Sequence, residues 1–214
     1  MTQCSVRRPS SRVANAFVFV SAVLLAPLGM ASAANAQTLG YASVQPNGYP
    51  ADEVIASDES ATPERLRRAV VAFGTTEAPG TIVIDTGNTT LYYVLGQGRA
   101  IRYGVGVGRE GFTWSGVQTV SRKAEWPDWH PPAEMIARQP YLPRFMAGGP
   151  GNPLGARAMY LGTTVYRIHG TNRPDTIGTA VSSGCFRLVN GDVADLYERV
   201  PVGTRVVIRQ KPEL

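Results

Sequence analysis

Three short runs rich in β-branched and aromatic residues, separated by turn sequences, most constrain the fold of this chain. They cover residues 81–85, 90–95 and 100–107. The first run ends at Thr86-Gly87-Asn88 and the second at Gly96-Gln97-Gly98, and glycine and asparagine in such positions are typical of tight turns. The pattern predicts a β-meander that opens an all-β or β-dominated fold.

The rest of the chain adds two strands and one clear helix. Strands are expected at 163–169 and 204–208. Between them, the apolar residues at 193, 196, 197 and 200 recur at helical spacing, and Asn190 is the expected N-cap. The stretch from Trp126 to Gly155 contains so many prolines and glycines that a long ordered loop is expected there. The fold class is therefore β-dominated with one short helix.

The chain is long enough for one folded domain but not for two. From Gly80 onward about 135 residues remain, which suits a single core. We expect this domain to cover residues 78–212, preceded by a polar tether or disordered arm at 37–77. Within the arm, Thr62-Pro63-Glu64 can begin a helix that runs to Phe73, while residues 70–73 can equally form a strand.

Residues 1–36 have the pattern of a secretory signal peptide. Arg7, Arg8 and Arg12 precede an apolar run at 14–27, and small residues suited to cleavage follow before Ala34 and before Gln37. An uncleaved membrane anchor is the alternative, although the run is short for a bilayer span. No later segment is apolar enough to cross a membrane, so no transmembrane anchor is expected after cleavage.

The formal charge argues against a nucleic-acid partner. The whole chain carries +5, but the leader holds three arginines and no acidic residue, so the mature chain is near +2. It has no stripe of lysine and arginine interleaved with aromatic residues, which nucleic-acid binding favours. We expect no nucleic acid among its partners.

Cys185 is the candidate nucleophile. The other cysteine, Cys4, lies in the leader, so the mature chain has one thiol and cannot form an internal disulfide. His169 precedes Cys185 with fifteen residues between them, and an imidazole can accept the thiol proton, which lowers the thiol pKa, and later return it to a leaving amine. The amides around Gly184 and Cys185 can hold an oxyanion, and Arg187 can bind a carboxylate.

Each of these residues also has a simpler interpretation. A lone cysteine after a glycine is often a small buried hydrophobe, and Arg187 can pair with Asp192 or Glu198. His130 is expected to be a loop residue packed among aromatic residues and prolines, and the rival zinc site with His169 and Cys185 has unsuitable spacing. Tryptophans 114, 126 and 129 are expected to anchor the core or loops rather than stack on sugar. No metal and no cofactor are expected.

The residues around the cysteine closely resemble the YkuD-type L,D-transpeptidases, and most of all their ErfK/YbiS/YcfS/YnhG branch. The resemblance rests on His169-Gly170-Thr171-Asn172 and on residues 182–188, and it extends over roughly 78–210. The family signature places Ser or Thr, usually His, and then Gly-Cys after the first histidine. Here Ser183 occupies the position of that second histidine, so no role of it carries over. The resemblance implies a β-sandwich catalytic domain in the periplasm.

The family resemblance also implies an acyl transfer on peptidoglycan stem peptides. Cys185 would attack the L-centre carbonyl of diaminopimelate and release D-alanine, and an amine of another stem or of an envelope protein would take the acyl group. His169 would be base and then acid, the Gly170 carbonyl would orient it, Ser183 and Gly184 would line the site, and Arg187 would bind a stem carboxylate.

Two other function classes remain open at this point. One is a hydrolase or carboxypeptidase that uses the same residues with water as acceptor, or an enzyme that forms or cleaves protein–peptidoglycan links. The other is a wall-binding module without activity. Papain-like enzymes are disfavoured because they place cysteine before histidine, and sortases are disfavoured because they separate the two residues much more widely.

Overall fold

A computed structural model describes residues 62–210 of the chain. Their elements, in chain order, are η2 (Glu64–Leu66), β1 (Ala69–Ala72), β2 (Ile82–Asp85), β3 (Thr90–Gly96), β4 (Arg99–Gly104), β5 (Val107–Gly108), β6 (Gly116–Glu125), α2 (Ala133–Arg138), β7 (Arg157–Leu161), β8 (Arg167–His169), η3 (Pro174–Thr176), β9 (Ala180–Ser182), β10 (Phe186–Arg187), α3 (Asn190–Arg199) and β11 (Arg205–Arg209). The signal peptide expected at 1–36 and most of the expected arm lie outside the described residues.

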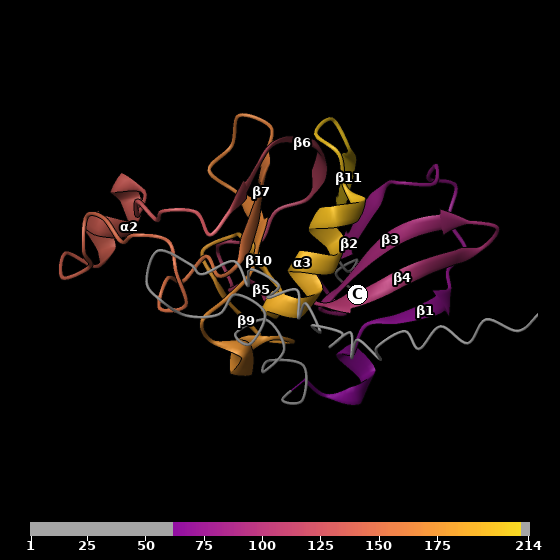
Figure 1. The fold of residues 1–214 in the computed structure, drawn as a ribbon, viewed down its shortest axis with the longest axis horizontal. Helices are drawn as coiled ribbons and strands as arrows, with labels where there is room; N and C mark the ends of the chain where they lie inside the picture. Colours follow the sequence, from indigo (N-terminus) through magenta and orange to yellow (C-terminus); the bar gives the residue numbers. More distant parts are fainter. Residues whose placement is uncertain (1–61, 211–214) are drawn as a thin grey trace, which may run out of the picture. The chain divides into compact units, whose positions relative to one another are not determined.

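Nine of the strands form one folded-over sheet in the order β1-β4-β3-β2-β11-β6-β7-β8-β10. The long strand β6 joins its two halves, because Gly116 to Thr119 pair with β11 and the residues from Val120 onward pair with β7. Figure 1 shows β6 between β7 and β11, with β1, β3 and β4 on the far side of β2. Both strand pairs of the expected meander are antiparallel. The expected β-dominated fold is confirmed.

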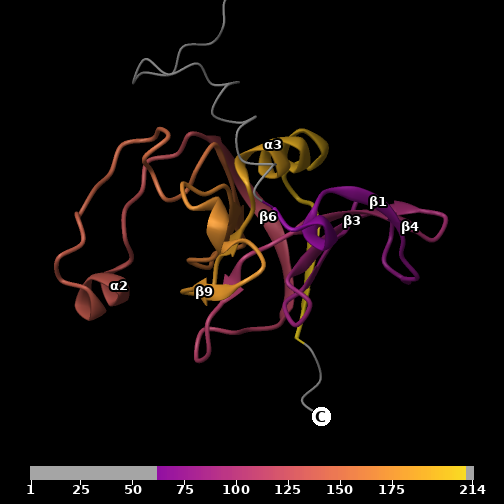
Figure 2. The ribbon, with the colours of Figure 1, turned by 90° about the horizontal axis from the view of Figure 1, so that it is seen from below.

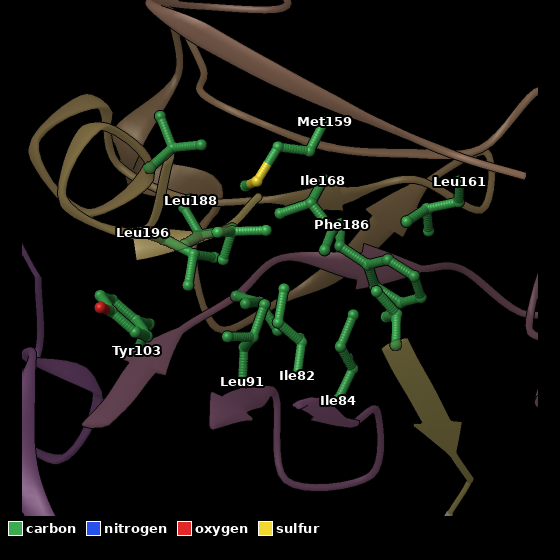
Figure 3. Packing of buried hydrophobic residues seen from close by; sticks show 14 of the residues in the cluster. Ile82, Ile84, Leu91, Tyr103, Met159, Leu161, Ile168, Phe186, Leu188 and Leu196 are labelled. Atoms are coloured by element: carbon green, nitrogen blue, oxygen red, sulfur yellow. The ribbon is translucent and has the colours of Figure 1, made fainter. Parts of the chain in front are cut away.

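The core lies between the two halves of this sheet. Ile82, Ile84 and Leu91 point from β2 and β3 toward residues of β7 and β8 on the opposite layer (Figure 3). Phe186 of β10 enters the same cluster and is almost completely buried. Because side chains alternate along a strand, burying Ile168 and Phe186 turns their neighbours to the outer face. That outer face carries the candidate site.

Helix α3 packs its apolar face on this core, but it begins differently from the expectation. Val193, Leu196 and Val200 are fully buried, as the helical spacing predicted. The N-cap position is held by Val189, and Asn190 is the first helical residue. Its side chain makes its hydrogen bonds to two other segments of the chain instead. The expected capping role of Asn190 is therefore wrong.

The proline-rich segment also differs from the expectation of a pure loop. It contains the six-residue helix α2, which follows Pro131-Pro132 and has the sequence Ala-Glu-Met-Ile-Ala-Arg. Proline restricts the backbone before a first helical turn, and these six residues favour a helix. Two views place α2 at the opposite end of the fold from β1, β3 and β4 (Figure 1, Figure 2).

The segment expected to be the end of a tether takes part in the sheet. Residues 69–72 form β1, which pairs with β4 at the sheet edge, and Leu66 of η2 is 1% exposed. This favours the strand alternative at residues 70–73 and adds a short 3₁₀ turn before it. The strand expected at 163–169 is shorter than predicted, because residues 161–164 form a turn closed by the Thr164 hydroxyl and the Leu161 carbonyl.

Candidate active site

Strands β8 and β10 place the candidate histidine and arginine side by side. The two strands are parallel neighbours, with Arg187 opposite His169 and Phe186 opposite Ile168. Paired residues share one face of a sheet, so His169 and Arg187 lie together, and by alternation Arg167 and Cys185 occupy the same face. All four side chains line one pocket of about 300 Å³. The spacing of the sequence is therefore compatible with a Cys–His site.

His169 is buried and held by the backbone. Its side chain Nδ1 lies 2.6 Å from the Gly170 carbonyl oxygen. Because a carbonyl can only accept, Nδ1 donates, and a neutral ring then has its free lone pair on Nε2. The pKa of His169 is lowered to about 3, chiefly by burial and next by the charge of Arg167, while hydrogen bonds with the backbone of Gly170 and Leu154 act in the opposite direction. The resting imidazole is therefore neutral.

Cys185 follows a tight turn that Ser182 closes. The Ser182 hydroxyl accepts from the Gly184 N–H at 3.2 Å and donates to the Cys185 carbonyl at 2.6 Å. The Gly184 amide expected to contact an oxyanion is thus already engaged in this state. Gly184 itself has a φ of +100°, and an added Cβ would overlap the Tyr166 ring. Only glycine fits there, because the left-handed region and the close ring both exclude a side chain.

Two aromatic residues pack against this turn. Trp114 stacks on Tyr166 with ring centroids 4.7 Å apart, and its indole Nε1 donates to the Gly184 carbonyl at 2.9 Å. The glycine-rich segment before them also packs here, since Gly106 exchanges two backbone hydrogen bonds with Arg187. Trp114 therefore anchors the site. An anchoring role was expected for it, although its contact with the cysteine turn was not.

The thiol is not the acidic group that the sequence suggested. Burial raises the pKa of Cys185, and this effect exceeds the lowering by the charge and hydrogen bonds of Arg167 and by the charge of Arg187. The Sγ atom lies 4.0 Å from the Val165 carbonyl oxygen. Burial thus favours the neutral thiol of Cys185 and, by lowering the pKa of His169, the neutral imidazole. A resting thiolate–imidazolium pair is therefore disfavoured. The expectation of a thiol with a lowered pKa is wrong for this state.

Arg187 faces the pocket with unused donors. Its Nε and Nη2 atoms are buried and have no hydrogen-bond partner among the described residues, and burial lowers its pKa. No ion pair joins it to Asp192 or Glu198 in that part of the chain, and Asp192 instead lies 3.8 Å from Arg68. Buried guanidinium donors without partners are rare, and they favour an anionic ligand at this position.

The pocket as a whole is strongly cationic. Four arginines line it, at positions 109, 138, 167 and 187, and Glu134 is its one acidic side chain. Arg109 donates to the Ser183 hydroxyl at 3.3 Å and covers the Phe112 ring, on which Arg138 also lies. Ser183 therefore lines the site through a contact with Arg109. Such a lining suits a ligand that carries several carboxylates.

Arg167 is the residue that the sequence reasoning missed. It contributes the largest single opposition to the raised thiol pKa, and its Nε atom is buried without a partner among residues 62–210. Its guanidinium lies 5.3 Å from the Tyr160 ring centroid, and that of Arg122 lies 3.7 Å from it. The signal was the two-residue period of a strand, which places residue 167 on the same face as residue 169.

His130 lies apart from this arrangement. It is exposed and packs against Phe145, with ring centroids 5.1 Å apart, and it does not line the pocket. Among residues 62–210 no three His, Cys, Asp or Glu side chains gather closely enough to hold a metal ion. In the same range, no helix has both the length and the apolar character to cross a bilayer.

The described residues thus form a β-sandwich domain that has a buried imidazole and a thiol in one pocket. Sequence comparison identifies its family. The profile of the YkuD family, the L,D-transpeptidase catalytic domain, matches residues 79–208. The chain belongs to this family.

Named relatives agree with that membership. In Escherichia coli K12, the probable L,D-transpeptidase ErfK/SrfK is 41% identical over 140 residues, 61% of this chain and 44% of the relative. The probable L,D-transpeptidase YbiS is 41% identical over 141 residues, 61% of this chain and 45% of the relative. The expected branch is confirmed. The match spans less than half the length of these relatives.

A solved structure gives the same fold. An L,D-transpeptidase from Mycobacterium smegmatis superposes with a TM-score of 0.51 at 19% identity, and the match covers 62% of this chain and 59% of that chain. At this level of identity the likeness concerns the fold alone. It agrees with the strand-dominated architecture derived above.

Proposed function

We propose that the catalytic domain expected at residues 78–212, extended by strand β1, cross-links peptidoglycan, joining the diaminopimelate residues of two stem peptides through a Cys185 thioester. The observation that carries this proposal is the pairing of β8 with β10. It places the neutral His169, with its proton on Nδ1, on the same face as Cys185 and Arg187. A neutral imidazole whose Nε2 can accept a proton, in the same pocket as a thiol, supports acyl transfer.

In the first half-reaction the Cys185 sulfur attacks the carbonyl carbon at the L-centre of diaminopimelate, and His169 Nε2 takes the thiol proton. The oxyanion that forms needs a donor, and we assign this to the backbone N–H of Cys185, because Ser182 holds that of Gly184. The C–N bond to D-alanine then breaks, and the imidazolium gives its proton to the leaving amine. A thioester on Cys185 remains.

In the second half-reaction an amine of another stem attacks this thioester. The amine loses a proton to His169, the C–S bond breaks, and the proton returns to the sulfur. The new amide joins the two stems, and the thiol is regenerated. No step needs an outside oxidant or reductant, and both proton transfers pass through His169.

The charge of the pocket supports a peptidoglycan donor. A tetrapeptide stem carries several carboxylates, and four arginines line the pocket against one glutamate. We assign Arg187 to one of these carboxylates, since its buried Nε and Nη2 donors are without partners among the described residues. Ser183 and Gly184 complete the wall beside the thiol.

We further propose that the protein acts in the periplasm, where peptidoglycan lies, and that it contributes to cell-wall organisation and cell shape. The amino-terminal pattern of three arginines and an apolar run supports export by a cleaved signal peptide. An envelope protein is an alternative source of the acceptor amine.

Covalent labelling tests the nucleophile. The intact protein should gain the mass of one carbapenem, which acylates a reactive thiol, and Cys185→Ala should gain none. His130→Gln serves as the control, because it lies outside the pocket and should label like the wild type. An adduct that persists in Cys185→Ala would place the nucleophile elsewhere.

Muropeptide analysis tests the acceptor. Cells that lack the protein should contain fewer L,D cross-links, and complementation with the wild type but not with Cys185→Ala should restore them. Unchanged cross-links together with altered tripeptide levels would show that water is the acceptor and would replace transpeptidation by hydrolysis.

A further inference from the structure

The side chain of Asn190 joins two chain segments that meet behind His169. It is 3% exposed. Its Oδ1 accepts from the Ala156 N–H at 2.9 Å and from the Thr171 N–H at 3.3 Å, and its Nδ2 donates to the Thr171 carbonyl at 2.9 Å. A buried amide with this many directed hydrogen bonds holds one orientation.

One peptide group links Asn190 to the candidate base. The carbonyl of the Gly170–Thr171 peptide is the acceptor for His169 Nδ1, at 2.6 Å. The N–H of the same peptide group belongs to Thr171 and donates to Asn190 Oδ1. Because a peptide group is planar, fixing its N–H also fixes the direction of its carbonyl. The His169 imidazole and the Asn190 amide therefore form hydrogen bonds with opposite edges of one planar peptide group.

Two glycines leave room for this contact and for nothing larger. A Cβ added to Gly155 or to Gly170 would overlap Asn190 Oδ1. The amide oxygen therefore fills the space that two side chains would otherwise occupy. Enclosure of this kind prevents the Asn190 side chain from changing rotamer without moving the backbone on either side.

We propose that Asn190 is a positioning residue that holds the Gly170–Thr171 peptide so that its carbonyl keeps the proton of His169 on Nδ1. Nε2 then keeps the lone pair that can accept a proton in the pocket that it shares with the thiol. Without this anchor the peptide can rotate, and the ring can exchange its proton between the two nitrogens. An imidazole in the wrong tautomer cannot take a proton from sulfur. The effect on turnover rests on the proposed function, but the effect on the tautomer does not.

NMR of nitrogen-15 in labelled histidine reads this tautomer directly. The chain has only two histidines, so His130→Gln leaves a single ring to observe. In that background the His169 ring should carry its proton on Nδ1. Asn190→Ala should add the tautomer protonated on Nε2. Asn190→Asp should add less of it, since a carboxylate still accepts from Ala156 and Thr171 although it loses the bond to the Thr171 carbonyl. A ring that stays wholly protonated on Nδ1 in Asn190→Ala would overturn the proposal.

Tyr103→Phe is the matched control. Tyr103 is fully buried, and its hydroxyl donates to Asp195 of the same helix α3 at 2.5 Å. This variant should lower the melting temperature without changing the His169 tautomer. If Tyr103→Phe shifts the tautomer as Asn190→Ala does, general loosening of α3 explains the effect and the proposal fails.

Two further measurements keep the proposal testable if Asn190→Ala does not fold. In the wild type, hydrogen exchange of the Thr171 amide should be strongly protected, and rapid exchange would contradict its bond to Asn190.

In Asn190→Asp, kcat should fall less than in other replacements of Asn190. For Asn190→Ala itself we expect a fall in kcat of about 10- to 100-fold, by analogy with groups that orient metal-bound histidines, with KM little changed. Failure of the wild type to react with a carbapenem would refute the proposed function but leave the tautomer result intact.

Discussion

The two members of the candidate catalytic pair are held in opposite ways. His169 is 5% exposed, and its ring is tied to a backbone carbonyl that Asn190 fixes in turn. Cys185 is partly exposed after a tight turn, and the nearest acceptor of its sulfur lies 4.0 Å away. The proposed base is therefore held by a chain of hydrogen bonds, while the ionisation of the proposed nucleophile is governed mainly by burial, with Arg167 and Arg187 acting in the opposite direction.

The electrostatics of the two residues point to a neutral resting pair. Burial lowers the pKa of His169 to about 3 and raises that of Cys185, so both changes favour thiol and imidazole over thiolate and imidazolium. In the proposed mechanism the proton therefore moves when the sulfur attacks a bound carbonyl. In such a site the base assists each turnover, rather than storing a reactive thiolate in advance.

The largest expected effect comes from removing the base. His169→Gln should lower the rate of acyl transfer by about 10²- to 10⁴-fold, the usual contribution of general acid–base catalysis. Alkylation of Cys185 by iodoacetamide at high pH should change much less, because a thiolate formed by the solvent needs no base. Steady-state kinetics and mass spectrometry measure the two rates. His130→Gln is the control variant. If it lost as much acyl-transfer activity as His169→Gln, His169 would have no specific role in the mechanism.

Replacing Gly184 should be the next most damaging change. Gly184→Ala forces a positive φ of 100° on alanine and drives its Cβ into Tyr166, whose ring is held by its stack on Trp114. We expect a loss of roughly 2 to 5 kcal/mol in the free energy of unfolding, from strain and overpacking together. Denaturant titration measures it.

Gly203→Ala separates these two causes. Gly203 has a similar φ of +92°, but no atom lies within 4 Å of an added Cβ. Alanine there should cost only the backbone term, about 1 kcal/mol. Equal losses in the two variants would show that the contact with Tyr166 contributes nothing, and that the turn before Cys185 is less tightly packed than the structure indicates.

How well each part of the site could be predicted depends on how far apart in the sequence its contacting residues lie. The meander was predictable because alternation and turn residues are local signals, and the family motif located Cys185 and His169. Asn190 was misjudged as an N-cap, because its true partners, Ala156 and Thr171, lie far from it in the sequence. No local pattern reveals such contacts, since strand order and loop path bring them together.

Two other differences have separate causes. The thiol pKa was expected to fall, because an imidazole could accept its proton, yet the pocket removes the sulfur from water although the residue is partly exposed, and this effect is the largest. Helix α2 was missed because prolines and glycines around it outweighed its six helix-favouring residues. Arg167 was accessible in principle, since the period of a strand already placed it beside His169 on one face.

A smaller effect should appear in the dependence of stability on pH. In the unfolded chain His169 has its ordinary pKa of 6.5, and in the folded chain its pKa is about 3. Between these values the unfolded state binds a proton that the folded state does not, so stability falls as the pH falls from 6.5 toward 3. One such proton changes the free energy of unfolding by about 1.4 kcal/mol per pH unit.

Denaturant titrations of the wild type and His169→Gln across pH 3 to 7 measure this linkage. The slope, not the absolute stability, is the test, because the substitution also changes packing. The variant should show a shallower decline over this window by up to one proton, while His130→Gln should follow the wild type. Parallel curves for wild type and His169→Gln would mean that the buried ring is protonated in the folded state.

The smallest effect should distinguish the two arginines beside the thiol. Both oppose the rise of the Cys185 pKa, but Arg167 acts through its charge and two hydrogen bonds, whereas Arg187 acts through its charge alone. Methionine keeps much of the length of either side chain and removes the charge. Arg167→Met should therefore move the pH midpoint of iodoacetamide alkylation further upward than Arg187→Met, and slow the reaction several-fold at neutral pH.

Arg187→Met should instead weaken binding of the donor stem more, because the buried N–H groups of Arg187 face the pocket unpaired in the described part of the chain. The reverse order in both measurements would assign acidity to Arg187 and substrate binding to Arg167.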